Sequence, residues 1–258
     1  MNKTALILSQ TGGQCRATNY IGLLRKALKD INCEHVPVLS VNASGMEGNP
    51  GFKYTFPLLK KSIMGVVYGD LLMRCLYRVR PYEIEPGSAN ALYERWNEIL
   101  RESLRGKSTR SEFCANISAI VDDFENLPIS HTPKPRVGVV GEILVKFHPE
   151  ANNNLVDHIE EEGGEAVVPD LLDFFLYCTY GAAFDRKNYG SGGKGYWGSM
   201  LATSVIEWMR GVMRRRLEVS TRFGAPIHIK KLAKLSSKMV SLGNQSGEGW
   251  LLTGEMME

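Results

Sequence analysis

The stretch at residues 10–20, Gln-Thr-Gly-Gly-Gln-Cys-Arg-Ala-Thr-Asn-Tyr, joins a predicted buried strand to a predicted helix. The strand is the short apolar run at 4–9, and apolar residues at helical spacing between Tyr20 and Ile31 predict the helix. A second strand is predicted at 35–41. Together these elements form a βαβ unit with an expected right-handed crossover and a ligand edge at the carboxyl ends of its strands.

Cys15 lies on that ligand edge, at the start of the predicted helix. The positive end of the helix dipole and the adjacent Arg16 both favour the thiolate, which is the form that binds metal or attacks electrophiles. Gly12 and Gly13 would let the backbone turn tightly and point its amides at an anion. We therefore predict a reactive or metal-ligating role for Cys15, with Gly12, Gly13 and Arg16 as cofactor-binding residues. The alternative is an ordinary, partly buried thiol.

The proline-rich segment 128–135 is the predicted domain boundary, because the α/β pattern starts again after it. A strand is predicted at 136–143, a helix after the asparagines at 152–154, and a further strand at 166–168. This order indicates a second βαβ unit.

Three polar residues of the second unit are candidate ligand contacts. Glu142 lies at the carboxyl end of the predicted strand and could act as an acid, a base or a substrate contact, although a solvated carboxylate is the alternative. Asn152 and Asn153 could bind a polar ligand. Helix capping by Asn153 or Asn154 would explain one of these asparagines without any ligand.

The fold class predicted from these patterns is α/β, with two Rossmann-like three-layer halves at 1–56 and 135–258. Residues 57–134 are expected to form a helical insert and linker of two or three helices, because their apolar positions keep helical spacing. The segment 250–258 looks like the beginning of a helix with nothing after it. We therefore expect the chain to be a truncated fragment.

Composition excludes some classes of function. The chain has 258 residues, enough to bury a sizeable core without a metal or a disulfide. A net charge of +3 is too small to indicate nucleic-acid binding, although an anionic small molecule is compatible with it. The five cysteines have no paired spacing, and neither a signal peptide nor a membrane-spanning stretch is recognised. We expect a cytoplasmic protein with reduced thiols and no membrane partner.

Several familiar site types fail on spacing. The chain contains no C-x-x-C, H-E-x-x-H or G-x-S-x-G motif, and no G-x-G-x-x-G after a strand. The glycine-rich segment 189–199 lacks the spacing of a P-loop and is interpreted as a loop that acts as a lid or a linker. The remaining cysteines are expected to be buried structural thiols: Cys33, Cys75, Cys114 and Cys178.

Five stretches read together resemble one family, the dehydratase-like region of the large 2-hydroxyacyl-CoA dehydratase activase proteins. They are Leu-Ser-Gln-Thr-Gly-Gly-Gln-Cys-Arg-Ala-Thr-Asn-Tyr (8–20), Tyr-Arg-Val-Arg-Pro-Tyr-Glu (77–83), Val-Gly-Glu-Ile (140–143), Phe-His-Pro-Glu-Ala-Asn-Asn-Asn (147–154) and Gly-Glu-Gly-Trp-Leu-Leu-Thr-Gly-Glu-Met (247–256). The resemblance runs in order across essentially the whole chain.

This resemblance implies an oxygen-sensitive iron-sulfur protein of anaerobes, expected to hold a 4Fe-4S cluster between two α/β domains. It also implies an ATP-dependent activase partner that supplies a low-potential electron, and an acyl-CoA as substrate. Cys15 matches a ligand-bearing motif of the family, and thiolates suit iron. One cysteine does not hold a four-iron cluster, so the cluster is expected to be incomplete or absent unless another segment adds ligands.

Two hypotheses of different classes follow. In the first, the chain is a component of a 2-hydroxyacyl-CoA dehydratase/activase system, a lyase-type assembly in which Glu142 and the loop at 152–154 face the crevice. In the second, it is a non-catalytic interaction module that docks an activase or dehydratase partner. An oligomer is compatible with either hypothesis.

Overall fold

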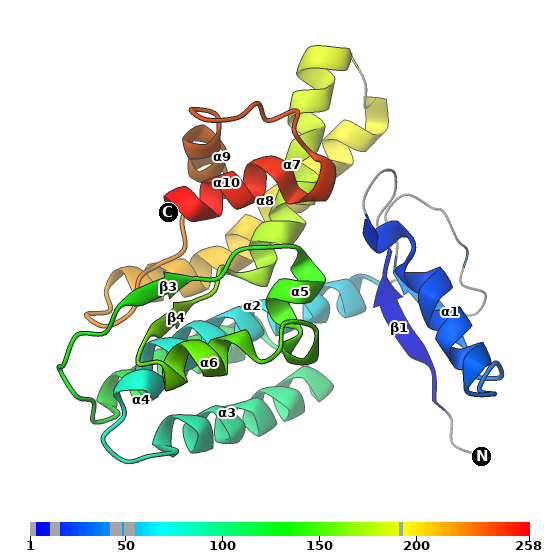
Figure 1. The fold of residues 1–258 in the computed structure, drawn as a ribbon. Coiled ribbons are helices and arrows are strands. Elements are labelled where there is room, and N and C mark those ends of the chain that lie inside the picture. The colour runs from blue at the N-terminus through cyan, green and yellow to red at the C-terminus, as the bar shows by residue number, and fades with distance from the viewer. Residues whose placement is uncertain (1–3, 11–15, 42–47, 49–54, 191–192) are drawn as a thin grey trace. The chain divides into compact units, whose positions relative to one another are not determined.

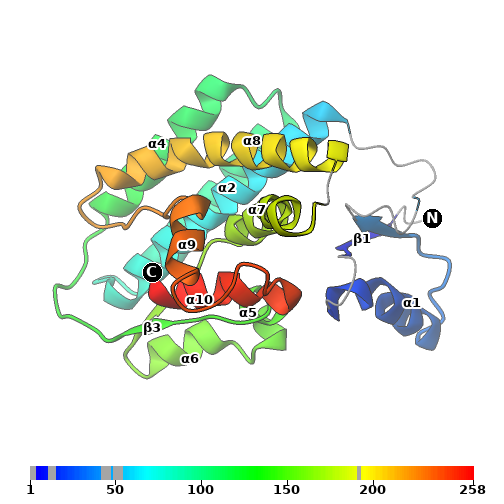
Figure 2. The same ribbon diagram turned by 90° about the horizontal axis from the view of Figure 1, so that it is seen from above.

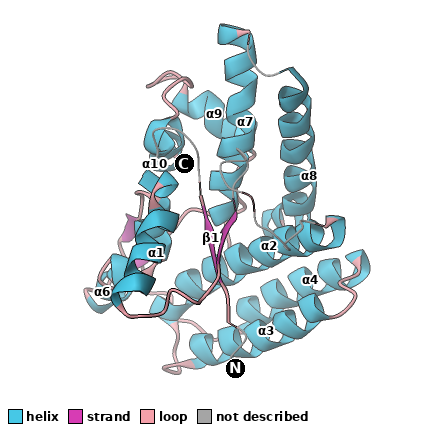
Figure 3. Ribbon diagram, turned by 90° about the vertical axis from the view of Figure 1, so that its right-hand side faces the viewer, coloured by secondary structure: helices cyan, strands magenta, loops and turns pink. Residues whose placement is uncertain are grey.

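The computed structural model describes residues 4–10, 16–41, 48, 55–190 and 193–258. This part of the chain is mostly helical, with a few short parallel strands (Figure 3). It divides into two compact units, residues 1–55 and 56–258, and each is described here on its own. The α/β character expected from the sequence is therefore present, with more helix and less sheet than three-layer halves would have.

The first unit contains the predicted βαβ arrangement. Its elements are β1 (Leu6–Ser9), η1 (Arg16–Thr18), α1 (Tyr20–Asp30) and β2 (Val38–Val41). The two strands are parallel, and Leu6 pairs with Val38 at the start of the register. Helix α1 buries Ile21 and Leu28, seven residues apart, as an amphipathic helix on a sheet should.

The second unit holds the remaining elements, arranged as Figure 1 shows. In chain order they are α2 (Phe56–Val79), η2 (Arg80–Tyr82), α3 (Ser88–Arg105), α4 (Arg110–Asn126), β3 (Arg136–Gly138), α5 (Ile143–Phe147), η3 (Pro149–Ala151), α6 (Leu155–Glu161), β4 (Glu165–Val167), α7 (Leu171–Tyr189), α8 (Gly193–Glu218), α9 (Ile229–Ser236), η4 (Ser246–Glu248) and α10 (Gly249–Met257). Among these described helices, none combines the length and the hydrophobicity needed to cross a bilayer.

Helix α2 is central to this unit (Figure 2), because it packs against α3, α4, α7, α8 and β4. It is apolar around most of its circumference, which is typical of a helix with neighbours on several sides. Met64, Val67, Leu71 and Val79 are all buried on it. The α-helix ends at Val79, where Pro81 enters the 3-10 turn that follows. The helical region expected before residue 124 is thus the three helices α2, α3 and α4.

Strands β3 and β4 form the second parallel pair, with Arg136 opposite Glu165. The strand predicted at 136–143 is shorter, because Glu142 caps a helix at this point. Its carboxylate accepts a hydrogen bond from the Val145 amide at 3.3 Å, and α5 begins at Ile143. Helices α5 and α6 fill the crossover between the two strands.

The glycine-rich segment 189–199 was wrongly interpreted as a loop over most of its length. Helix α7 ends at Tyr189 with Gly190 in the left-handed conformation, and α8 already begins at Gly193. Helices α7 and α8 pack against each other, and Arg186 of α7 lies over the Tyr196 ring of α8 at 4.4 Å. This tertiary packing outweighs the low helix propensity of glycine.

Candidate functional site

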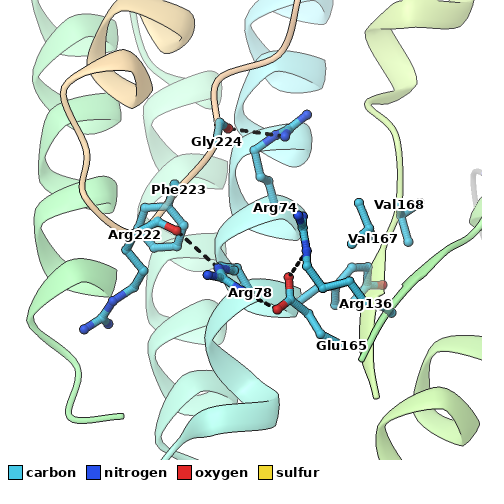
Figure 4. A pocket seen from close by; sticks show the side chains of 11 residues that line it. Arg74, Arg78, Arg136, Glu165, Val167, Val168, Arg222, Phe223 and Gly224 are labelled. Carbon is cyan, nitrogen blue, oxygen red and sulfur yellow. Dashed lines mark hydrogen bonds and ion pairs between the residues drawn. The ribbon is translucent and has the colours of Figure 1, made fainter. Parts of the chain in front are cut away.

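A pocket of about 160 Å³ opens where α2, the β3–β4 pair and the loop after α8 meet. Four arginines line it, together with the buried Glu165, which is the carboxylate among its described lining residues (Figure 4). Arg74 and Arg78 lie one helical turn apart on α2, Arg136 begins β3, and Arg222 lies on the loop. The pocket therefore has an excess of positive charge.

Glu165 holds the base of the pocket. Its carboxylate forms an ion pair with Arg78 and a second with Arg136, whose Nε lies 3.0 Å away. The Tyr82 hydroxyl donates to the same carboxylate at 2.8 Å. Because three donors converge on one buried carboxylate, the two guanidinium groups are fixed in place on either side of it (Figure 4).

Backbone carbonyl groups fix the remaining wall. The Arg78 Nε donates to the Arg222 carbonyl oxygen at 3.2 Å, and an Arg74 Nη donates to the Gly224 carbonyl oxygen at 3.3 Å. The Arg222 guanidinium points away from Arg78 in Figure 4 and donates to the carbonyl oxygens of Phe124 and Leu127. Arg222 thus contributes its backbone carbonyl group to the pocket wall, whereas its charged side chain is hydrogen-bonded to carbonyl groups that do not line the pocket.

Donors remain available at the mouth of the pocket. One Nη of Arg78 and both Nη atoms of Arg136 have no hydrogen-bond partner within the described part of the chain. The Arg136 side chain is 63% exposed and that of Arg78 is 39% exposed, so a ligand can reach both. Guanidinium groups with open N–H donors match the oxygen atoms of phosphate or carboxylate.

A buried ion network supports the pocket from behind. Asp170 accepts from Arg74 at 2.6 Å and from Arg210 at 2.8 Å, and Arg210 also pairs with Asp173 at 2.7 Å. Although burial alone would raise the pKa of Asp170, the charges of Arg74 and Arg210 outweigh it and hold that pKa below its usual value. Burial raises the pKa of Asp173 to about 6. The network ties α2, α7 and α8 together.

Asp70 completes this network at the start of α7. It accepts hydrogen bonds from the amides of Leu171 and Leu172, at 2.8 and 3.0 Å, and so satisfies free N–H groups of that helix. Burial, together with the nearby charge of Asp170, raises the pKa of Asp70 well above its usual value.

Most of the residues predicted at the ligand edge of the first βαβ unit lie outside the residues that the structure describes. Gly12, Gly13 and the predicted metal ligand Cys15 lie outside the described residues. Arg16 is exposed at the start of η1. Beside this turn, the buried Gln10 donates to the Thr18 carbonyl oxygen at 2.9 Å and accepts from the Ser40 hydroxyl at 2.7 Å. These bonds connect the carboxyl ends of β1 and β2.

The candidates of the second half have structural partners. The carboxylate of Glu142 caps α5, as described above. The Asn152 side chain donates to the Val145 carbonyl oxygen at 2.8 Å and accepts from the Leu155 amide at 3.1 Å. Asn153 is exposed in the left-handed conformation, and Asn154 takes the N-cap position of α6 without a side-chain capping bond. Their proposed ligand contacts stay predictions.

The structure brings two of the quoted motifs together around α5. Lys146 on α5 and Glu255 on α10 form a buried ion pair, with Nζ 2.9 and 3.0 Å from the two carboxylate oxygens. Burial raises the pKa of Glu255 to about 7. Glu248 accepts from the Ile143 amide at 3.1 Å, and burial raises its pKa as well. Sequence reasoning singled out Glu142 here and missed these two glutamates.

The described cysteines do not form a cluster site. Cys75 is buried in α2, where burial raises its thiol pKa to well above the usual value, and Cys33 and Cys114 are partly buried. Cys178 is exposed on α7, which corrects its assignment as a buried thiol. No group of three or more potential metal ligands occurs within the described ranges. The predicted iron site therefore depends on Cys15, and it stays a prediction.

The spacing of the pocket arginines on α2 is visible in the sequence, but the predictions above did not use it. Arg74, Arg78 and Tyr82 recur every four residues, so the two arginines share one face of α2, and Tyr82 follows in the 3-10 turn η2. Two of them belong to the stretch 77–83 quoted above. Arg78 and Tyr82 share the partner Glu165, which lies far along the chain on a strand whose position only the tertiary fold gives.

Fold and pocket together define a helix-rich α/β protein with an arginine-lined pocket beside a short parallel sheet. The chain matches no protein-family model, no curated protein and no solved structure. The interpretation of the pocket therefore rests on its geometry and its chemistry.

Proposed function

We propose that the protein is a component of a 2-hydroxyacyl-CoA dehydratase/activase system and that its arginine pocket binds a phosphate group of an acyl-CoA. The observation that carries the proposal is the set of open N–H donors on Arg78 and Arg136 around a cavity in which Glu165, the carboxylate among the described lining residues, is already paired. The sequence resemblance supplies the expectation of a CoA thioester.

The size of the pocket limits what enters it. Its 160 Å³ is below the roughly 300 Å³ at which pockets begin to enclose a drug-sized ligand, so it suits one anionic group of a larger molecule. An acyl-CoA carries phosphates at one end and its reactive thioester at the other. In this proposal the pocket anchors the nucleotide end, and the pocket residues take no part in the chemical step.

Titration calorimetry with CoA tests the anchoring role. We expect CoA to bind and Arg136→Gln to weaken it about threefold to tenfold, because one exposed charge contributes modestly. Pantetheine, which lacks the phosphates, should bind much more weakly than CoA. The matched control is Arg101→Gln, an exposed arginine of α3 that pairs with Glu98. An unchanged CoA affinity in Arg136→Gln, or equal affinity for pantetheine, would contradict the proposal.

We also propose that Cys15 ligates the iron of a 4Fe-4S cluster and that each parallel strand pair is part of a Rossmann-like half. Iron content after anaerobic purification tests the ligand. We expect Cys15→Ser to lose iron and Cys178→Ser, at an exposed thiol of α7, to retain it. Equal iron in Cys15→Ser and the unaltered protein would exclude Cys15 as a ligand. If neither iron nor CoA binds, the non-catalytic interaction module becomes the better hypothesis.

A further inference from the structure

A second pocket, of about 370 Å³, lies at the opposite end of α2 from the arginine pocket. Its wall is mainly apolar and comes from three helices: Phe56, Leu59, Ile63 and Met64 of α2, Phe113 of α4, and Val205, Trp208, Met209 and Val212 of α8. We refer to it as the apolar pocket. Met64, Phe113 and Met209 are buried at its base, whereas Leu59 and Trp208 are more than half exposed.

The mouth of the apolar pocket carries positive charge. Lys60 and Arg110 are its charged lining residues, and no carboxylate is present among the lining residues that the structure describes. Helix α2 begins at Phe56 and α4 begins at Arg110, so the positive ends of two helix dipoles lie at the same pocket. Exposed Phe56 and Trp208 would thus contact a ligand in a positive field.

The two cations are held in position but keep free donors. The Lys60 ammonium donates to the Ser108 carbonyl oxygen at 2.9 Å, which leaves its other hydrogens available. The Arg110 guanidinium lies over the Trp208 ring, 4.0 Å from its centroid, and makes no ion pair with a described residue. Stacking fixes the plane of the guanidinium and leaves its N–H edge open.

We propose that the apolar pocket binds a small amphipathic carboxylate, with the apolar tail between α2 and α8 and the carboxylate at Lys60 and Arg110. The volume is within the range of roughly 300–1,000 Å³ that is typical of small-molecule sites. An uncharged apolar ligand would leave both cations unpaired, and a free inorganic anion would leave the apolar wall in contact with water. A ligand with an apolar tail and a carboxylate pairs with the two cations and also covers the apolar wall. This inference does not depend on CoA binding.

Octanoate is a suitable probe, and 1-octanol is its uncharged counterpart of similar length. We expect octanoate to bind, with a change in Trp208 emission that is lost in Trp208→Phe. Binding of 1-octanol should be about tenfold weaker, since it lacks the charge-assisted hydrogen bonds. Titration calorimetry measures both affinities.

Two variants locate the site. Arg110→Gln should weaken octanoate about tenfold and leave 1-octanol unchanged, whereas Arg105→Gln, an exposed arginine near the end of α3, should change neither. Val205→Trp should fill the pocket and abolish binding. Leu201→Trp makes a similar change at an exposed position one helical turn away that does not line the pocket, and it should leave binding intact.

Circular dichroism of each variant checks that it is folded. If Val205→Trp fails to fold, the comparison of octanoate with 1-octanol in Arg110→Gln still decides the question. The proposal is overturned if octanoate does not bind, if 1-octanol binds as tightly, or if Arg110→Gln and the folded Val205→Trp protein bind octanoate like the unaltered protein.

Discussion

Lys146 and Glu255 show how a single buried pair makes stability depend on pH. Both side chains are almost fully removed from solvent, and their mutual contact offsets part of the cost of burial. Burial raises the pKa of Glu255 from 4.5 to about 7. Between these two values the folded protein holds a proton on Glu255 that the unfolded chain has released.

We therefore predict that the contribution of Glu255 to stability is present in full below pH 4.5 and is lost as the pH rises to about 7. The expected loss is on the order of 2–3 kcal/mol. Urea unfolding of the unaltered protein and of Glu255→Gln at pH 5 and pH 8 measures it, because glutamine does not titrate. Glu98→Gln, at an exposed position of α3, is the control. The same pH dependence in the Glu255→Gln protein would contradict a raised pKa.

Among the elements, α4 has a well-defined start that can be tested separately. The Thr109 hydroxyl accepts from the Glu112 amide at 3.2 Å and satisfies one of the free N–H groups of the first turn. This helix buries Phe113, Ile117 and Phe124 in the main core, so a weaker start affects the whole second unit.

Removal of this cap should destabilise the protein by about 1 kcal/mol in Thr109→Ala. Thr109→Ser keeps the hydroxyl, so this variant should unfold at a urea concentration close to that of the unaltered protein. The midpoint of urea unfolding compares the two variants. Equal midpoints for alanine and serine would show that the hydrogen bond contributes nothing measurable to stability.

Local patterns predicted the elements better than their ends. Helical spacing of apolar residues predicted α1 and the helical region that contains α2 to α4, since burial on one face of a helix gives a periodic pattern in the sequence. The strand expected up to Ile143 ends at Gly138, and the Glu142 side chain caps a helix that begins at Ile143. The helical start of α8 carried no local signal, since its stability comes from packing on α7.

For the whole molecule, the site was harder to predict than the elements. The arginines of α2 have a visible spacing, but their partners Glu165 and Asp170 lie some 90 residues away and meet them only in the fold. Glu142 was chosen because it follows a predicted strand, and the structure gives its carboxylate a capping role. Chemistry that depends on convergence of distant segments leaves little trace in a single sequence.

Arg210 has a consequence for how the second unit assembles. Its guanidinium is fully buried and is neutralised by Asp170 and Asp173, at and just beyond the start of α7, while Asp170 also reaches α2 through Arg74. If α8 docked before α7, a bare cation would have to shed its water with no counter-charge in place. A partly assembled state of this kind is disfavoured, so stable docking of α8 depends on the carboxylates of α7.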